Sequence, residues 1–174
     1  MLLYKQSNNN PANPVTLRIL LTLLLLLPSL LRADLIGIDV GRGNHNSRDS
    51  TAVFFRYVRD LRLWEGMPFY GEFLAGRWDG GYENQSFSLG LGLRYPLPDN
   101  WSLGASGGIG YVHERNNHLG THPQFVFRFG INYRFGKNEL SLTQRHYSNG
   151  KGLFQWDGPN VGENFIMFGL AREF

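Results

Sequence analysis

A histidine and a serine stand two residues apart near the end of the chain, at His146 and Ser148. In a β-strand, alternate side chains share a face, and their backbones lie about 6.6 to 6.8 Å apart. The imidazole and the hydroxyl of such a pair can reach hydrogen-bond distance, which is the relationship that a hydroxyl nucleophile needs with its base. The pair therefore indicates nucleophilic chemistry only if this segment is a strand, so its meaning depends on the elements that position it.

Long alternating segments occupy most of the chain after residue 33. Between Phe87 and Tyr95, apolar residues take one parity while Ser, Gly and Arg take the other, and residues 125–135 repeat the pattern. A period of two residues indicates strands with one apolar face. The segments are longer than the roughly five to six residues usual in globular proteins, and their polar parity suits the interior of a narrow barrel. The pattern favours an outer-membrane barrel, in which apolar side chains face lipid.

Eight segments have this character, so the predicted fold is all-β: an eight-stranded antiparallel transmembrane β-barrel of the outer membrane. The predicted strands are residues 34–42, 52–60, 68–78, 85–95, 101–112, 123–135, 138–147 and 164–174. Closure is required because an open edge would leave backbone groups unpaired in hydrocarbon. Short turns are expected at residues 96–100 and 136–137, and longer polar loops at 43–51, 79–84, 113–122 and 148–163.

Residues 1–33 are interpreted as a secretory signal peptide, and residues 34–174 as the barrel domain. The leader has Lys5 and Arg18 before its apolar core, a small residue at Ala33, and no acidic residue. Its uninterrupted apolar part is shorter than the roughly 20 residues that a spanning helix needs, and Pro28 follows it. We therefore expect cleavage near Ala33 rather than a retained anchor.

Charge and cysteine content exclude several classes of protein. The formal charge of +3 belongs to the leader, because the rest of the chain carries equal numbers of acidic and basic residues. A neutral body offers no basic surface, so no nucleic-acid partner is expected. The chain has no cysteine, which excludes a disulfide scaffold and a lipoprotein anchor.

Topology predicts where the histidine and serine lie. If the first strand begins in the periplasm, the seventh strand runs outward and the loop over residues 148–163 lies outside the cell. His146 and Ser148 continue the lipid-facing parity of that strand, together with Gln144. They are therefore expected near the outer interface, where the alternative is that they only tolerate lipid headgroups and have no chemical role.

The other polar residues are given structural interpretations. The remaining histidines fall in or beside the expected loops and are predicted to be surface-exposed: His45, His113, His118 and His122. His118 and His122 lack a third ligand, so no metal site is predicted. The interior parity is expected to hold a salt-bridged plug rather than a pore, made by Glu72, Arg94, Arg128, Arg134 and Glu139.

A longer pattern surrounds the histidine and serine. His146, Ser148 and Asn149 are followed by Pro159-Asn160-Val161-Gly162 and a last strand that closes on an aromatic residue. This order resembles the carboxy-terminal motif of the PagL-type lipid A 3-O-deacylases, which is approximately HxSNAG, a short loop, PNxG and a final strand. The chain departs from that motif in having SNGKG in place of SNAG and a longer loop before PNxG.

The resemblance implies an enzyme, a serine esterase that hydrolyses the acyl chain ester-linked at the 3-position of lipid A. It implies Ser148 as the nucleophile and His146 as its base. Asn149 would help to hold the oxyanion, with a backbone N–H from the turn between Gly150 and Gly152. It further implies lipopolysaccharide as the substrate, multi-pass insertion in the Gram-negative cell outer membrane, a homodimer, and no cofactor.

The third member of the catalytic group departs from the family pattern. In the family a glutamate at the start of the last strand orients the histidine, and counting from Gly162 its place is taken here by Asn164, while the glutamate is Glu163. One residue in a strand is a change of face. Strand parity favours Asn164, whereas Glu163 has the right chemistry and would need a bulge to reach His146. Both stay candidates, with Asn164 favoured on geometry.

Two other functions stay open on the sequence. A non-enzymatic small outer-membrane barrel, adhesive or structural, would explain the strands but has no requirement for the histidine, serine and PNxG motif. A phospholipase on the same fold would use the same catalytic group, because such a group hydrolyses any ester that reaches it.

Overall fold

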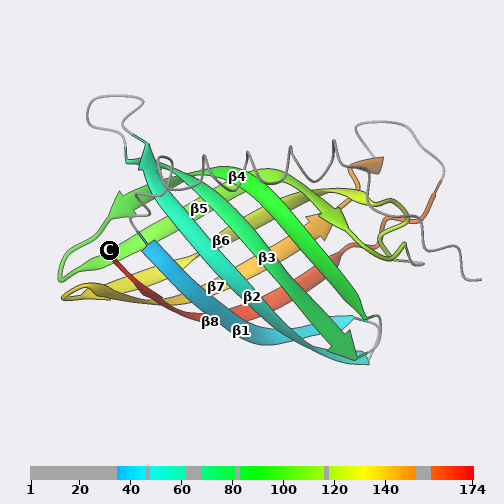
Figure 1. The fold of residues 1–174 in the computed structure, drawn as a ribbon, viewed down its shortest axis with the longest axis horizontal. Helices are drawn as coiled ribbons and strands as arrows, with labels where there is room; N and C mark the ends of the chain where they lie inside the picture. The colour runs from blue at the N-terminus through cyan, green and yellow to red at the C-terminus, as the bar shows by residue number, and fades with distance from the viewer. Residues whose placement is uncertain (1–34, 46–47, 62–67, 81–82, 116–117, 152–157) are drawn as a thin grey trace, which may run out of the picture. The chain divides into compact units, whose positions relative to one another are not determined.

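Eight antiparallel strands close into a barrel in the computed structural model (Figure 1). The structure describes residues 35–45, 48–61, 68–80, 83–115, 118–151 and 158–174. Each strand pairs with its neighbours in sequence, and β1 pairs with β8, which closes the sheet. The predicted barrel is therefore confirmed. The expected signal peptide lies outside the described residues, and in the part that is described no helix is long and apolar enough to cross a membrane.

The strand bounds agree closely with the predicted segments. The strands are β1 (Leu35–His45), β2 (Arg48–Leu61), β3 (Phe69–Gly80), β4 (Asn84–Pro96), β5 (Trp101–Val112), β6 (Pro123–Phe135), β7 (Asn138–Ser148) and β8 (Glu163–Arg172). The bounds predicted for β5 and β6 match residue for residue, and the largest differences occur at the junction of β1 and β2.

The long polar loop expected over residues 43–51 is wrong. β1 and β2 continue their pairing through this segment, with Gly43 opposite Ser50 and His45 opposite Arg48. The loop expected over residues 79–84 is shorter as well, since β3 runs to Gly80 and β4 begins at Asn84. The sequence analysis missed these strand ends because their residues are polar. Pairing between strands is made by backbone groups and does not require apolar side chains.

The two faces of the barrel have the polarity that the alternation predicted. On β4 the outward side chains of Phe87, Leu89 and Leu91 are more than half exposed, while the intervening Ser86 and Ser88 are buried. Apolar side chains thus form the outer surface, and small polar side chains line the interior. This arrangement suits a protein whose surroundings are hydrocarbon.

Ion pairs fill the middle of the interior. Arg56 contacts both Asp39 and Glu139 at 3.2 Å, and Arg145 contacts Asp39 at 2.7 Å. All four side chains are essentially inaccessible to solvent. Because opposite charges alternate along this chain of contacts, each desolvated group has a partner.

The predicted salt-bridged plug is confirmed in four of its five members. Arg94 lies 2.9 Å from Glu139, and Arg128 lies 3.4 Å from Glu72. The fifth, Arg134, was wrongly placed: it is nearly half exposed and lies 3.8 Å from Glu173. Arg134 is the second-to-last residue of β6 and therefore lies at the rim of the barrel, which parity alone does not reveal. Parity also did not single out Asp39, Arg56 and Arg145.

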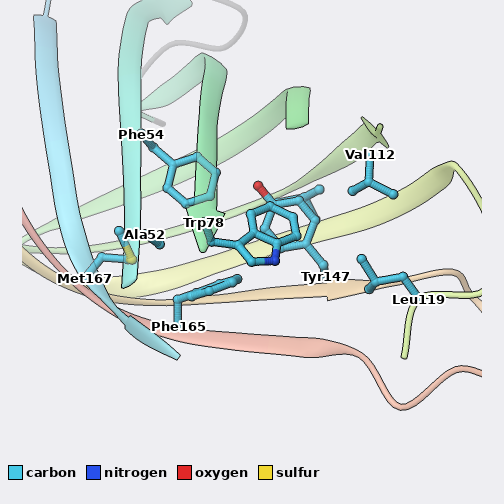
Figure 2. Close-up of a cluster of buried hydrophobic side chains, with 9 residues drawn as sticks. Ala52, Phe54, Trp78, Val112, Leu119, Tyr147, Phe165 and Met167 are labelled. Atoms are coloured by element: carbon cyan, nitrogen blue, oxygen red, sulfur yellow. The ribbon is translucent and has the colours of Figure 1, made fainter. Parts of the chain in front are cut away.

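An aromatic cluster fills the interior at the end of the barrel where β7 ends and β8 begins, which we term the site end (Figure 2). The ring of Trp78 lies 5.2 Å from that of Tyr147 and 5.3 Å from that of Phe165. Leu119, from the connection between β5 and β6, is fully buried in the same cluster. Because Tyr147 points inward, its neighbours His146 and Ser148 must point outward.

We expect Arg56→Met to lower the free energy of unfolding by about 3 to 5 kcal/mol, because it leaves Asp39 and Glu139 buried with fewer partners. Unfolding by urea or guanidinium of the barrel refolded in detergent micelles measures the change. The matched control is Arg77→Met, since Arg77 is exposed and lies 3.4 Å from an exposed Asp79; it should change stability by less than about 1 kcal/mol. Equal effects of the two substitutions would contradict an interior held by ion pairs.

Candidate active site

Strand β7 presents the histidine and the serine on the outer face of the barrel. In the antiparallel register His146 lies opposite Phe127 of β6 and opposite Asn164 of β8, and Ser148 lies opposite Phe125. His146, Ser148 and Asn164 are half-buried. Residues directly opposite in an antiparallel pair bring their side chains within contact distance, so the site is built across β6, β7 and β8.

His146 is oriented by Asn164. Nδ1 of His146 lies 2.9 Å from Oδ1 of Asn164. An amide oxygen only accepts, so the imidazole donates its hydrogen from Nδ1, and Nε2 is left with the lone pair of a general base. On the β6 side the ring of Phe127 stacks against the imidazole, with centroids 6.5 Å apart and planes inclined at 23°.

A glycine completes the wall beside His146. Gly162 has a φ of 79°, a left-handed backbone that side chains rarely adopt. A Cβ at this position would lie 2.8 Å from Cε1 of His146 and 2.8 Å from the carbonyl oxygen of Tyr147. The last residue of the PNxG motif is therefore glycine because the backbone touches the imidazole there.

Glu163 lies on the other face of β8. It pairs in register with Tyr147 and is buried inside the barrel, where its Oε1 lies 3.2 Å from Nδ1 of His118. The register of β8 is regular from Glu163 onward, and no bulge turns the carboxylate toward His146. Of the two candidates for the third member, Asn164 has the contact with His146 and Glu163 does not.

The hydroxyl of Ser148 contacts a second asparagine. Nδ2 of Asn160 lies 3.2 Å from Oγ of Ser148, and the backbone N–H of Gly150 donates to the same oxygen at 3.3 Å. The N–H of Asn149 donates to Oδ1 of Asn160 at 3.0 Å, which fixes the orientation of that amide. Among the described residues no hydrogen bond joins Ser148 to His146, and such bonds are often long before substrate binds.

The expected oxyanion donor Asn149 has another set of contacts. Its Nδ2 donates to the carbonyl oxygen of Leu119 at 2.5 Å and to that of Pro159 at 2.7 Å. Both amide hydrogens are thus engaged in tying two connections together, which leaves none for an oxyanion in this conformation. The sequence analysis matched Asn160 only as part of PNxG and gave it no role. Gly152 lies outside the described residues.

The other histidines differ in their environments. His113 is exposed, as predicted, whereas His118 is buried, so its predicted exposure is wrong. Although it belongs to a polar connection, His118 lies inside the barrel, close to Glu163. His122 stacks on Tyr111 at 5.1 Å and is half-buried. His45 belongs to β1 rather than to a loop. In the described part of the chain, no three His, Cys, Asp or Glu residues gather as a metal would need.

Two open grooves on the outer surface adjoin the site. One, of about 360 Å³, is lined by His146, Gln144 and Phe127 together with Ala105 of β5. The other, of about 630 Å³ and almost wholly apolar, extends from Asn149 across Phe125 and neighbouring residues of β4, β5 and β6. Apolar space therefore adjoins both His146 and Asn149, on the surface that faces lipid.

A closed barrel with an apolar outer surface defines an outer-membrane protein, and comparisons with known proteins agree. The family model described as Lipid A 3-O-deacylase (PagL) matches residues 51–173, and the chain belongs to this family. The outer-membrane enzyme PagL, in its crystal structure, is similar in fold: 18% identity, a TM-score of 0.57, and coverage of 80% of this chain and 99% of that one.

Solved structures of two other β-barrel proteins share the fold. The N-terminal β-barrel domain of Pseudomonas aeruginosa OprF has 12% identity and a TM-score of 0.53, covering 82% of this chain and 98% of that one. The Yersinia pestis protein Ail has 11% identity and a TM-score of 0.51, covering 81% and 99%. A comparison with curated proteins found no match. The structural likenesses establish the fold, and the family match establishes membership of the lipid A 3-O-deacylases.

We expect Asn164→Ala to lower kcat/KM on lipid A by about 100-fold or more, because His146 loses the acceptor that sets its tautomer. Glu163→Ala should cost about tenfold or less, since the carboxylate faces the interior. Deacylation assayed in detergent micelles measures both. The reverse order would show that the strand is bulged in the working enzyme and that the carboxylate orients His146.

Proposed function

We propose that the protein is a serine esterase that removes the acyl chain ester-linked at the 3-position of lipid A. The observation that carries the proposal is the contact of His146 with Asn164 on the same outward face as Ser148. This contact leaves Nε2 of the imidazole unprotonated, as a base for the serine hydroxyl must be. A structural barrel has no use for such an arrangement on its lipid-facing surface.

The reaction proceeds in two steps on Ser148. Its Oγ attacks the carbonyl carbon of the ester while His146 takes the hydroxyl proton at Nε2, and the tetrahedral intermediate then expels the sugar oxygen, to which His146 returns the proton. Water, deprotonated by the same imidazole, next attacks the carbonyl carbon of the acyl-serine, and the fatty acid is released as His146 returns the proton to Oγ of Ser148. Throughout, Asn164 holds Nδ1–H and so keeps Nε2 as the atom that exchanges protons.

The oxyanion is assigned to Asn160 and Gly150 rather than to Asn149. Nδ2 of Asn160 and the N–H of Gly150 both lie beside Oγ of Ser148, at 3.2 and 3.3 Å, and the carbonyl under attack must approach that oxygen. Because Asn149 N–H holds Oδ1 of Asn160, the amide keeps its NH₂ group toward the serine. Donors fixed before the substrate arrives stabilise the developing charge without reorganisation.

The position of the site suits a substrate that stays in the membrane. We place the loops of the site end outside the cell, so that the catalytic group lies at the level of the outer leaflet, and each strand crosses the membrane once. The grooves beside His146 and Asn149 give acyl chains apolar space on the barrel surface. The ester can therefore reach Ser148 without extraction of the lipid. A homodimer, which the family resemblance implies, stays a prediction.

Ser148→Ala and His146→Asn should each abolish deacylation and leave the barrel folded, because both side chains lie on the outer face and support no interior contact. Mass spectrometry of lipid A from cells that express each variant reports activity, and electrophoretic mobility with and without boiling reports the fold. An active Ser148→Ala protein would contradict a serine esterase. Release of phospholipid acyl chains with intact lipid A would instead identify a phospholipase, and no ester hydrolysis at all would leave a non-enzymatic barrel.

Asn160→Asp should lower kcat by about 10² to 10³-fold, because it keeps the acceptor for Asn149 N–H but replaces the NH₂ donor by a negative charge facing the oxyanion. Steady-state kinetics on lipid A in micelles would show this as a loss in kcat, with KM little changed. Unchanged kcat in a folded Asn160→Asp barrel would remove Asn160 from the oxyanion hole.

A further inference from the structure

A buried histidine and a buried glutamate lie in contact directly beneath the outward-facing site. Nδ1 of His118 is 3.2 Å from Oε1 of Glu163, and each side chain is 4% exposed. The mechanism proposed above uses neither group. Burying a carboxylate is costly unless it has a partner. The contact with His118 therefore favours the inward position of Glu163 at the first residue of β8.

The backbone around His118 contacts both ends of the site. The carbonyl oxygen of His118 accepts from the N–H of Val161 at 2.8 Å and from that of Gly162 at 3.2 Å. The next carbonyl, that of Leu119, accepts from Nδ2 of Asn149. Two consecutive residues of the β5–β6 connection are thus bonded to the chain just after Ser148 and to the chain just before Asn164.

These contacts bear on the orientation of Asn164. Glu163 and Asn164 are adjacent in a strand, so a side chain held inward at the first requires the second to point outward. Gly162, whose backbone N–H donates to the carbonyl oxygen of His118, lies against the imidazole of His146. A small rotation of residues 162–164 would change the contact between His146 and Asn164, and misplacements of about 1 Å in an active site can cost about 100-fold in rate.

We propose that His118 is a positioning residue for the catalytic group: by holding Glu163 inside the barrel it keeps Asn164 directed at Nδ1 of His146. The inference rests on the proposed function. It gives the displaced glutamate a role, since the carboxylate that cannot reach His146 from its face of the strand acts on it through the backbone. Leu119, anchored in the aromatic cluster, fixes the connection from which His118 acts.

The test compares variants of the pair in the full chain. His118→Ala and Glu163→Ala remove either partner, and the double variant removes both. His118→Asn keeps a donor nitrogen near the place of Nδ1, and Glu163→Gln keeps an acceptor oxygen of the same reach. His113→Ala is the matched control, because His113 lies in the same connection but is exposed, and its imidazole lies near the equally exposed Glu114.

Three readouts separate positioning from other roles. Steady-state deacylation of lipid A in micelles gives kcat and KM, labelling by a fluorophosphonate probe gives the reactivity of Ser148 without lipid, and mobility with and without boiling gives the fold. We expect each alanine variant to lower kcat and the labelling rate together by about tenfold, with KM changed by less than about twofold. The double variant should be no worse than either single one, His118→Asn and Glu163→Gln should recover most of the loss, and His113→Ala should match the wild type.

The proposal is overturned if the alanine variants keep full kcat, if only KM changes, if the two losses add in the double variant, or if the conservative variants fail to recover activity. Loss of the folded barrel in both alanine variants would make the pair an element of folding and would also overturn it. Failure of the proposed function is a separate result, seen in the wild type as no labelling of Ser148 and no change in lipid A.

Discussion

The two-residue period of β7 and β8 is the constraint on which the rest of the site depends. Tyr147 packs into the aromatic cluster and contacts Ser86 with its hydroxyl at 3.0 Å, so its orientation is fixed by the interior. His146 and Ser148 must then face lipid, and the residue opposite His146 in the register must face lipid with it. The geometry of the proposed catalytic group is thus set by packing on the other side of the sheet.

The strands alone do not supply the hydrogen-bond donors around Ser148. Its neighbours Asn160 and Gly150 come from the connection between β7 and β8, and that connection is held in turn by the one between β5 and β6, through Asn149 and Leu119. Connections in small barrels are usually the parts with the fewest buried contacts. Here both are tied to the interior, which gives the outer surface of a membrane barrel the rigid donors that ester hydrolysis needs.

The sequence predicted the elements whose signal is local and periodic. Alternation predicts the number of strands, the polarity of the two faces and the pairing of His146 with Asn164, because successive residues of a strand point to opposite faces. Contacts made by the connections between strands were not predicted. His118 is buried beside Glu163, at the start of a strand 45 residues further along the chain, and the placement of Asn160 beside Ser148 depends on how the connection between β7 and β8 turns back. The ends of β1 and β2 were not predicted because the strands pair there through backbone groups, and polar side chains give no alternating pattern that would indicate it.

The residue that contacts His146 is a neutral amide where a carboxylate would offer both an advantage and a cost. A carboxylate at that position would stabilise the imidazolium formed when His146 takes the serine proton, but it would also place a charge on a surface in contact with lipid, where unpaired charge is costly. Asn164 accepts the same hydrogen bond at 2.9 Å without a charge. In the proposed mechanism the neutral amide therefore sets the tautomer of His146 and leaves stabilisation of the transition state mainly to the donors around the oxyanion. The carboxyl group of Glu163, one residue away, lies inside the barrel, 3.2 Å from Nδ1 of His118, rather than in hydrocarbon.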